Sequence, residues 1–386
     1  MPVDHIGQRI AALRRVRRMT QADLARAIPA SLSTVKAIER GARNPSADML
    51  ERIAETLGVD VARLVPGYTG VAGRVQAALP SISAAIAGYD VPLDPPGRSL
   101  RQLTVDIGTG VECRLAARYG PIALTAPELL RDALAHLHAQ SGPGRALTAR
   151  LVVAAARTAD AVAYKYGAHD LSARLIEVMR WAAEQAADPD LIGVVSYVRA
   201  ETFLAAHSHR GGLVALERAL DGRAPLTPAV RGALHMRAAV VAARARDECA
   251  ATAHMAEARG LAEGLAEGVY LGTAFGRTSV RIHELAVAVG LGGDRIGRAL
   301  GTAREWRPGA EVPAERRSGY YIDLGRAQLW QGRPDAAFAS LRTARDLAPQ
   351  HVREHPWARA DVERIRRLKR GDVAGLSAFT EWIGAV

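Results

Sequence analysis

The chain has 386 residues and a formal net charge of +11 at pH 7, a length that predicts two or more domains. No apolar run approaches the roughly 20 residues that span a bilayer, so no membrane partner is expected. The two cysteines, Cys113 and Cys249, lie far apart without a CxxC spacing. Neither a disulfide framework nor a zinc knuckle is therefore expected, and the predicted location is a reducing cytoplasm.

The positive charge favours polyanionic partners such as nucleic acid. Lysine occurs only at Lys36, Lys165 and Lys369 and asparagine only at Asn44, whereas alanine, arginine and glycine are abundant. A GC-rich genome produces this bias in amino-acid composition. Part of the excess of arginine therefore reflects codon usage and not a function. The charge supports nucleic-acid binding but does not establish it.

The segment from residue 20 to residue 58 predicts three short helices separated by tight breaks. Helix caps are expected at Thr20, Ser31 and Ser46, a left-handed stop at Gly41, and the end of the last helix at Gly58. Val35 and Ile38 would anchor the middle helix and leave its outer face free. A short helix held in this way by its neighbours has the geometry that presents a helix to the major groove of DNA.

The runs TQADLA, STVKAIERG and RNPS in this segment resemble the Cro and phage-repressor type of helix-turn-helix, also called the XRE family, over about residues 6–64. The resemblance implies a five-helix, all-α DNA-binding head in which Gln21 binds a phosphate and Leu32, Ser33 and Ala37 face base edges. The positions expected to contact the groove or the phosphates are Ser31, Thr34, Lys36, Arg40 and Arg43. The resemblance further implies that Arg14 pairs with Glu39.

Two departures from the family pattern bear on how DNA would be read. Pro29 stands where glycine is common at the turn, and it should still end the preceding helix. Leu32 and Ala37 are apolar where long polar side chains are frequent, so few hydrogen bonds to bases are available. The apolar pair could contact thymine methyl groups, whereas the alternative is that Leu32 packs inside the domain.

From Pro121 onward, helix and short break alternate to the end, with alanine and leucine at helical spacing. One stretch resembles a tetratricopeptide repeat in the spacing of Tyr321, Leu324, Gly325, Gly332, Ala337, Leu341, Ala344 and Pro349. It departs from the usual residue types at Tyr321, Gln328 and Leu341. The fold class is therefore predicted to be all-α, with the head followed by a tetratricopeptide-like α-solenoid. The predicted domains are the head over residues 1–66, ending at Pro66-Gly67, a linker with one or two helices over residues 67–120, and the solenoid over residues 121–386. Within the linker, the alternating run Leu103–Ile107 could form a strand, although it has no partner.

No catalytic or metal-binding constellation stands out, so an enzyme, a cofactor and a metal site are not expected. His351 and His355 have the i, i+4 spacing of a helical metal pair, but no third ligand is evident and they are interpreted as a surface pair. Candidate residues for an effector groove are Arg157, Tyr164 and Arg277.

The combined architecture resembles actinobacterial XRE-family regulators with a tetratricopeptide-like sensory half. It predicts a sequence-specific transcriptional regulator that binds double-stranded DNA as a homodimer on an inverted repeat. The solenoid would dimerise, sense a small-molecule or peptide effector, or do both. The alternative is a tetratricopeptide-type scaffold for a protein or peptide partner, with the helix-turn-helix as an accessory.

Overall fold

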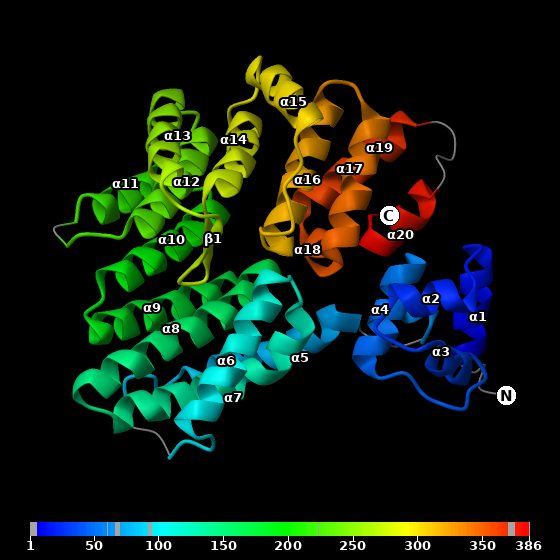
Figure 1. Cartoon of the computed structure of the whole chain (residues 1–386), viewed down its shortest axis with the longest axis horizontal. Coiled ribbons are helices and arrows are strands. Elements are labelled where there is room, and N and C mark those ends of the chain that lie inside the picture. The colour runs from blue at the N-terminus through cyan, green and yellow to red at the C-terminus, as the bar shows by residue number, and fades with distance from the viewer. Residues whose placement is uncertain are drawn as a thin grey trace. The chain divides into compact units, whose positions relative to one another are not determined.

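The computed structural model describes residues 6–59, 61–65, 70–91, 95–222, 224–369 and 375–385 (Figure 1). Within these ranges nearly all regular structure is helical, as predicted, and no described helix has the length and hydrophobicity to cross a membrane. The chain divides into two units. The head unit comprises Met1–Arg74 together with Ala358–Val386, and the repeat unit comprises Val75–Trp357.

In the segment predicted to form five helices, the described residues of the head unit form four α-helices and a short 3₁₀ turn. The elements are α1 (Ile6–Val16), α2 (Gln21–Ala27), α3 (Leu32–Glu39), α4 (Ala47–Leu57) and the 3₁₀ turn Val61–Arg63. The C-terminal segment contributes most of α19 (Pro356–Leu368) and α20 (Leu376–Ile383). An ion pair at 3.0 Å between Arg63 Nη1 and Glu381 Oε2 joins the 3₁₀ turn to α20.

The predicted helix boundaries of the head are confirmed at the caps. Thr20 forms a capping box with Asp23, and the Ser31 and Ser46 hydroxyls accept hydrogen bonds from backbone N–H groups three residues on. Helix α2 ends before Pro29, which cannot continue the hydrogen-bond ladder. Gly58 ends α4 at φ 62°, a left-handed conformation in which glycine carries no steric penalty. The predicted domain end at Pro66-Gly67 lies outside the described residues.

One core holds these short helices together, although each of them is too short to be stable alone. Its members are Ile10, Leu24, Ile28, Val35, Ile38, Leu50, Ile53, Ala54, Leu57, Val59, Val61 and Leu64. Gly7 brings α1 against the end of α3, because a Cβ at this position would lie 2.1 Å from the Ile38 carbonyl oxygen. The core therefore holds α3 through its buried face, which carries Val35 and Ile38, and leaves the opposite face exposed.

The repeat unit is built from antiparallel helix pairs. Its helices are α5 (Gly70–Ala85), which begins in the head unit, α6 (Leu100–Leu115), α7 (Tyr119–Ala139), α8 (Gly142–Lys165), α9 (His169–Ala186), α10 (Pro189–Ala205), α11 (His209–Leu220), α12 (Pro228–Arg244), α13 (Glu248–Glu263), α14 (Arg277–Leu291), α15 (Arg295–Glu305), α16 (Ala314–Trp330), α17 (Pro334–Leu347) and α18 (Pro349–Glu354). The strands β1 (Gly268–Tyr270) and β2 (Thr273–Phe275) form an antiparallel hairpin between α13 and α14, with Val269 paired to Ala274.

Alternate helices of the repeat unit form an inner layer. Each of α6, α8, α10, α12, α14 and α16 contacts the next in this order, and α16 also contacts α6, so the inner helices form a ring. The helices α7, α9, α11, α13, α15 and α17 each pack against the inner helix that precedes them (Figure 1). This two-layer arrangement of helix pairs is the one expected of a solenoid.

Five inner helices end in the same turn, although the residues at the turn differ. The left-handed residues are Ala117, Gly167, His207, Arg246 and Gly332, with φ between 54° and 78°. In each turn, the N–H of the left-handed residue donates to the carbonyl three residues back, and the following N–H donates to the carbonyl five residues before it. This is the Schellman pattern, which satisfies the last carbonyls of a helix and reverses the chain. The shared turn makes the repeats equivalent in structure where the sequence similarity is faint.

The tetratricopeptide-like spacing predicted near the C-terminus corresponds to the pair α16 and α17. Ala337, Leu341 and Ala344 are fully buried where the two helices cross. Gly325 lets the helices approach, since a Cβ there would lie 3.2 Å from the Ala337 carbonyl oxygen. The small residues therefore perform the packing role that the pattern assigns to them.

The structure draws the domain boundaries differently from the sequence. The predicted linker contains α5 and α6, and α6 packs against α7 and α8 as part of the inner ring. The run Leu103–Ile107 is helical, because the buried residues of α6 recur at helical spacing from Leu103 through Ile107 and Gly110 to Cys113. Residues 358–386, assigned to the solenoid, group instead with the head.

Candidate nucleic-acid interface

Helix α3 has a buried face and an exposed face along its whole length. Val35 and Ile38 are each 2% exposed and belong to the core, whereas Leu32 is 40% exposed. Leu32 therefore lies at the surface, where it could contact DNA, and does not pack inside the domain. Of the other predicted contact residues, Ser31, Ser33, Lys36, Arg40 and Arg43 are exposed, and Gln21, Thr34 and Ala37 are partly exposed.

Three hydroxyl groups cluster at the N-terminus of α3. The Ser31 Oγ lies 2.7 Å from the Ser33 Oγ and 2.9 Å from the Thr34 Oγ1. It also accepts a hydrogen bond from the Thr34 N–H at 3.1 Å. A hydroxyl can both donate and accept, so the group has hydrogen-bonding capacity left for a ligand. The helix dipole adds a partial positive charge at the same place, which favours phosphate oxygens.

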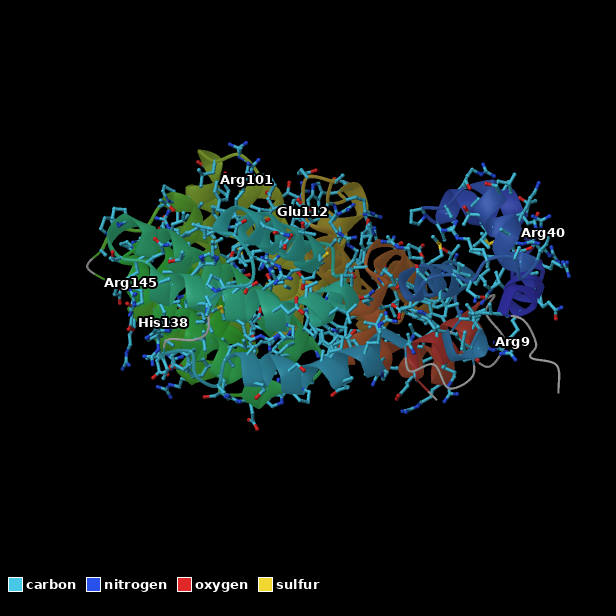
Figure 2. All side chains as sticks on the ribbon, turned by 90° about the horizontal axis from the view of Figure 1, so that it is seen from below. Arg9, Arg40, Arg101, Glu112, His138 and Arg145 are labelled. Atoms are coloured by element: carbon cyan, nitrogen blue, oxygen red, sulfur yellow. The ribbon has the colours of Figure 1, made fainter. Side chains whose placement is uncertain are left out.

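Cationic side chains continue the exposed surface toward the end of α3. Lys36, Arg40 and Arg43 are all exposed, and Figure 2 shows Arg40 at the surface of the head unit. Arg40 Nε donates to the Lys36 carbonyl at 3.2 Å, so this exposed guanidinium lies along the helix end. The exposed side of α3 and of the turn that follows it therefore combines the hydroxyl cluster and three cationic side chains with the apolar Leu32 and Ala37.

Glu39, at the buried end of α3, connects three helices. Its carboxylate accepts from Arg14 Nε at 2.6 Å and Nη2 at 3.0 Å, and from Gln21 Nε2 at 2.8 Å. The expected ion pair is therefore present, with side-chain exposures of 9% for Arg14 and 5% for Glu39. Gln21, expected to bind phosphate, has one N–H engaged by Glu39 and one remaining. The network fixes the angle between α2 and α3.

The electrostatics of this pair favour its charged state. Burial acts to raise the pKa of Glu39, but the hydrogen bonds from Arg14 and Gln21 and the Arg14 charge outweigh it and hold the pKa below its usual value. The hydrogen bond from Glu39 in turn raises the pKa of Arg14. Both groups are therefore ionised at neutral pH.

Sequence reasoning missed a structural role for Arg9 in α1 and for Arg17, which directly follows α1. Arg17 donates to the Leu57 and Gly58 carbonyls at 2.8 and 3.2 Å, and Arg9 donates to the Leu64 carbonyl at 3.3 Å. The last carbonyls of a helix lack partners within the helix, so the end of α4 requires donors of this kind. The basic character of α1 therefore serves the fold in part. Arg15 and Arg18 are exposed.

In the repeat unit, the structure places two of the three candidate effector residues together. Arg157 and Tyr164 line one cavity, but Arg277 does not contribute to it. Arg277 is exposed at the start of α14 and donates to the Glu263 carbonyl at 2.8 Å. Arg277 therefore stays a prediction, and the break that suggested it is the hairpin between α13 and α14.

The histidine pair His351 and His355 is also placed differently from the prediction. His351 is 3% exposed and lies in α18, with its Nδ1 3.2 Å from the Ser318 hydroxyl. Burial lowers the pKa of His351 to about 3, so the imidazole is neutral at pH 7. The pair is therefore an internal packing element and not a surface pair. Among the described residues no group of three or more His, Cys, Asp or Glu side chains could hold a metal ion.

The geometry of α1 to α4 defines a helix-turn-helix domain, and residues 5–65 match the family described as "Helix-turn-helix domain". The segment is similar to the immunity repressor protein of Bacillus phage phi105, with 43% identity over 60 residues. The match covers 16% of this chain and 42% of that repressor, so the chain spans less than half the length of this relative.

A solved structure is also similar over a longer range. The crystal structure of Bacillus thuringiensis PlcR in complex with the peptide PapR7 and DNA aligns with 68% of this chain and 95% of its own chain. The sequence identity is 14% and the TM-score is 0.27, a level of likeness that does not by itself establish a shared fold.

Proposed function

We propose that this protein is a sequence-specific transcriptional regulator that binds double-stranded DNA by placing α3 in the major groove. The exposed face of α3 carries the proposal, because its polar and basic side chains stand on a helix held rigidly by the core and by Glu39. The match of residues 5–65 to the helix-turn-helix domain supports the same use. A cytoplasmic location follows from that function.

Each side chain on the exposed face of α3 would have its own role in binding DNA. The exposed Leu32 and the partly exposed Ala37 would contact thymine methyl groups, and Ser33 would hydrogen-bond to base edges. Lys36, Arg40 and Arg43 would bind phosphates, which adds affinity without sequence preference. Because few hydrogen bonds to bases are available, selectivity would depend on half-site spacing and DNA shape as well.

A homodimer on an inverted repeat is part of the proposal. Helix α3 has 8 residues and reads too few base pairs for selectivity in a genome. Two copies on half-sites one helical turn apart would double the recognised sequence. The repeat unit would supply the dimer contact, an effector site, or both, and would thereby control the spacing of the two heads.

We expect the double substitution Ser33→Ala and Lys36→Ala to weaken specific DNA binding by about 10-fold to 100-fold, since one base contact contributes about 1–3 kcal/mol. Loss of Lys36 alone should reduce the salt dependence of binding by about one counterion. The measurement is a gel-shift titration, in which DNA is titrated with the protein at several salt concentrations.

Arg298→Ala is the matched control, because Arg298 is an exposed arginine on α15 of the repeat unit. It should leave DNA affinity unchanged. If the double variant binds DNA as tightly as the parent protein, α3 is not the reading helix. If the variant also keeps a protein partner that the parent binds, the scaffold function becomes the better account.

A further inference from the structure

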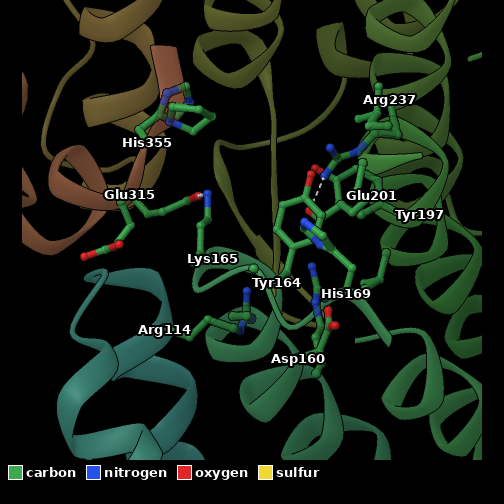
Figure 3. Close-up of a pocket in the computed structure, with 18 of the residues that line it drawn as sticks. Arg114, Asp160, Tyr164, Lys165, His169, Tyr197, Glu201, Arg237, Glu315 and His355 are labelled. Atoms are coloured by element: carbon green, nitrogen blue, oxygen red, sulfur yellow. Dashed lines mark hydrogen bonds and ion pairs between the residues drawn. The ribbon is translucent and has the colours of Figure 1, made fainter. Parts of the chain in front are cut away.

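The inner ring of the repeat unit surrounds a cavity of about 630 Å³ that is rich in charged side chains (Figure 3). Helices α6, α8, α10, α12 and α16 all contribute to its wall, so residues far apart in the sequence meet there. Its cationic residues are Arg114, Arg157, Lys165, Arg237, Arg244 and Arg316. Its carboxyl residues are Asp160, Glu201, Glu315 and Glu354.

The carboxylates do not balance the cations. Glu201 pairs with Arg237 at 3.0 Å, and Glu315 pairs with Lys165 at 3.3 Å. Asp160 adds little negative charge, because burial raises its pKa to about 8 and its carboxyl is mostly protonated at pH 7. The wall therefore carries a net positive charge.

Four arginines of the cavity have no ion-pair partner within the part of the chain that the structure describes, and neutral groups position them instead. Arg114 and Arg157 donate to the hairpin, at the Gly272 and Leu271 carbonyls, at 2.8 and 2.9 Å. The other two are Arg316, which donates to the Tyr197 hydroxyl at 3.0 Å, and Arg244, whose guanidinium lies 3.9 Å from the centre of the Trp357 ring. These contacts orient the guanidinium groups but place no carboxylate at ion-pair distance from them.

Hydrogen-bonding groups in the wall also lack partners. Among the residues that the structure describes, the buried Nε atoms of Arg114, Arg237 and Arg244 have no acceptor, and neither does the hydroxyl of Tyr119, a residue that is 1% exposed. A buried donor without an acceptor is costly, and native proteins leave few of them. These donors belong to side chains that line the same cavity.

Packing alone does not explain this arrangement. Buried cations without counterions destabilise a fold, and here several of them repel one another. Burial and the neighbouring Arg114 lower the pKa of Arg157 to about 9, which reflects the same cost. Perturbed groups of this kind concentrate at functional sites, and the cavity volume lies within the usual range for small-molecule sites.

We propose that this cavity binds a small organic anion that carries at least two negative charges on phosphate or carboxylate groups. The planar guanidinium fork matches both groups, and it can donate two parallel hydrogen bonds to either one. Tyr164 and Trp357 supply aromatic surface beside the arginines for the carbon skeleton of the ligand. The anion would supply the missing countercharge and acceptors. Its use as an effector rests on the proposed function, whereas its binding does not.

The test uses the full chain, with pyrophosphate and citrate as probes of the two anion classes and glucose as an uncharged control. At constant ionic strength, isothermal titration should show saturable binding of at least one anion and none of glucose, and the same anion should raise the melting temperature. Stronger binding of pyrophosphate would assign a phosphate ligand, and stronger binding of citrate a carboxylate ligand.

Arg244→Gln should reduce the affinity for the anion at least 10-fold and should remove most of the rise in melting temperature that the anion produces, because it removes one guanidinium that would bind the anion. Arg298→Gln, on the exposed side of α15, should change neither quantity. Circular dichroism of each variant verifies the helix content. If neither anion binds, or if Arg244→Gln binds as well as the parent protein, the proposal is wrong. DNA binding measured on the same samples separates this outcome from a failure of the proposed function.

Discussion

Replacing Glu39 with alanine is expected to destabilise the head unit by about 3–5 kcal/mol, the cost of breaking a buried ion pair by removing one partner. The substitution would leave the Arg14 guanidinium buried without its carboxylate and would also remove the acceptor of Gln21. Hydrogen exchange of the α1 to α4 amides in the full chain measures this loss locally. The same variant should lose DNA binding, because α3 would no longer be fixed against α2.

The double variant Arg14→Met and Glu39→Leu is the control for the loss of Glu39. It removes both charges and replaces them with apolar side chains, so most of the stability should return. If Glu39→Ala alone leaves amide protection in the head unchanged, the buried network does not hold α3 as described.

The pH dependence of the head follows from the same carboxylate. The folded-state pKa of Glu39 is lower than its unfolded value, so its stabilising contribution is fully present above the unfolded pKa. That contribution is lost as the pH falls through the folded pKa, where Glu39 becomes protonated. Acid should therefore reduce amide protection in the head, and less so in the Arg14→Met and Glu39→Leu variant.

Gly7→Ala is expected to destabilise the head unit by about 2 kcal/mol, as overpacking against a fixed neighbour does. The added Cβ would meet the carbonyl oxygens of Ile38 and Glu39 at 2.1 and 2.8 Å. These are backbone atoms at the end of α3, so relief requires that the whole of α1 moves. The expected loss exceeds the gain of about 1 kcal/mol in helix propensity when alanine replaces glycine.

Gly108→Ala is the matched control for Gly7→Ala. Gly108 lies within α6, and a Cβ there meets nothing within 4 Å. This substitution should stabilise the repeat unit by about 1 kcal/mol through helix propensity alone. Hydrogen exchange of the two units reports both effects. Gly108→Ala is expected to stabilise its own unit. If Gly7→Ala likewise stabilises the head unit, α1 does not approach α3 as closely as described.

The sequence predicted local features of the head well because the signals are themselves local. Thr20, Ser31 and Ser46 cap helices within three residues of themselves, and Pro29 ends α2 through its own ring. The pairing of Arg14 with Glu39 was available only through the family resemblance, since 25 residues separate the two. Arg17 was missed because its partners are backbone carbonyls, which leave no pattern in side-chain identity.

The sequence predicted that the repeat unit is helical, but it did not predict all of its helices or the ring that they form. Leu103–Ile107 is too short for alternation to be distinguished from a helix, and only the continuation to Gly110 decides between them. The ring depends on the contact between α6 and α16, which lie about 200 residues apart in a chain whose repeats are faint. The cavity was therefore found only in part, through Arg157 and Tyr164. Arg277 is predicted from a local break in the helical pattern, and such a break carries no information about which distant helices meet.

The most direct test of the account is selection of DNA from a random pool by the full-length protein. The account predicts enrichment of an inverted repeat whose half-sites lie one helical turn apart, with binding that weakens as salt increases. The double variant Ser33→Ala and Lys36→Ala should fail to enrich the same sequence. A pool that remains random after repeated rounds, or the same enrichment by the double variant, would contradict the claim that α3 reads DNA.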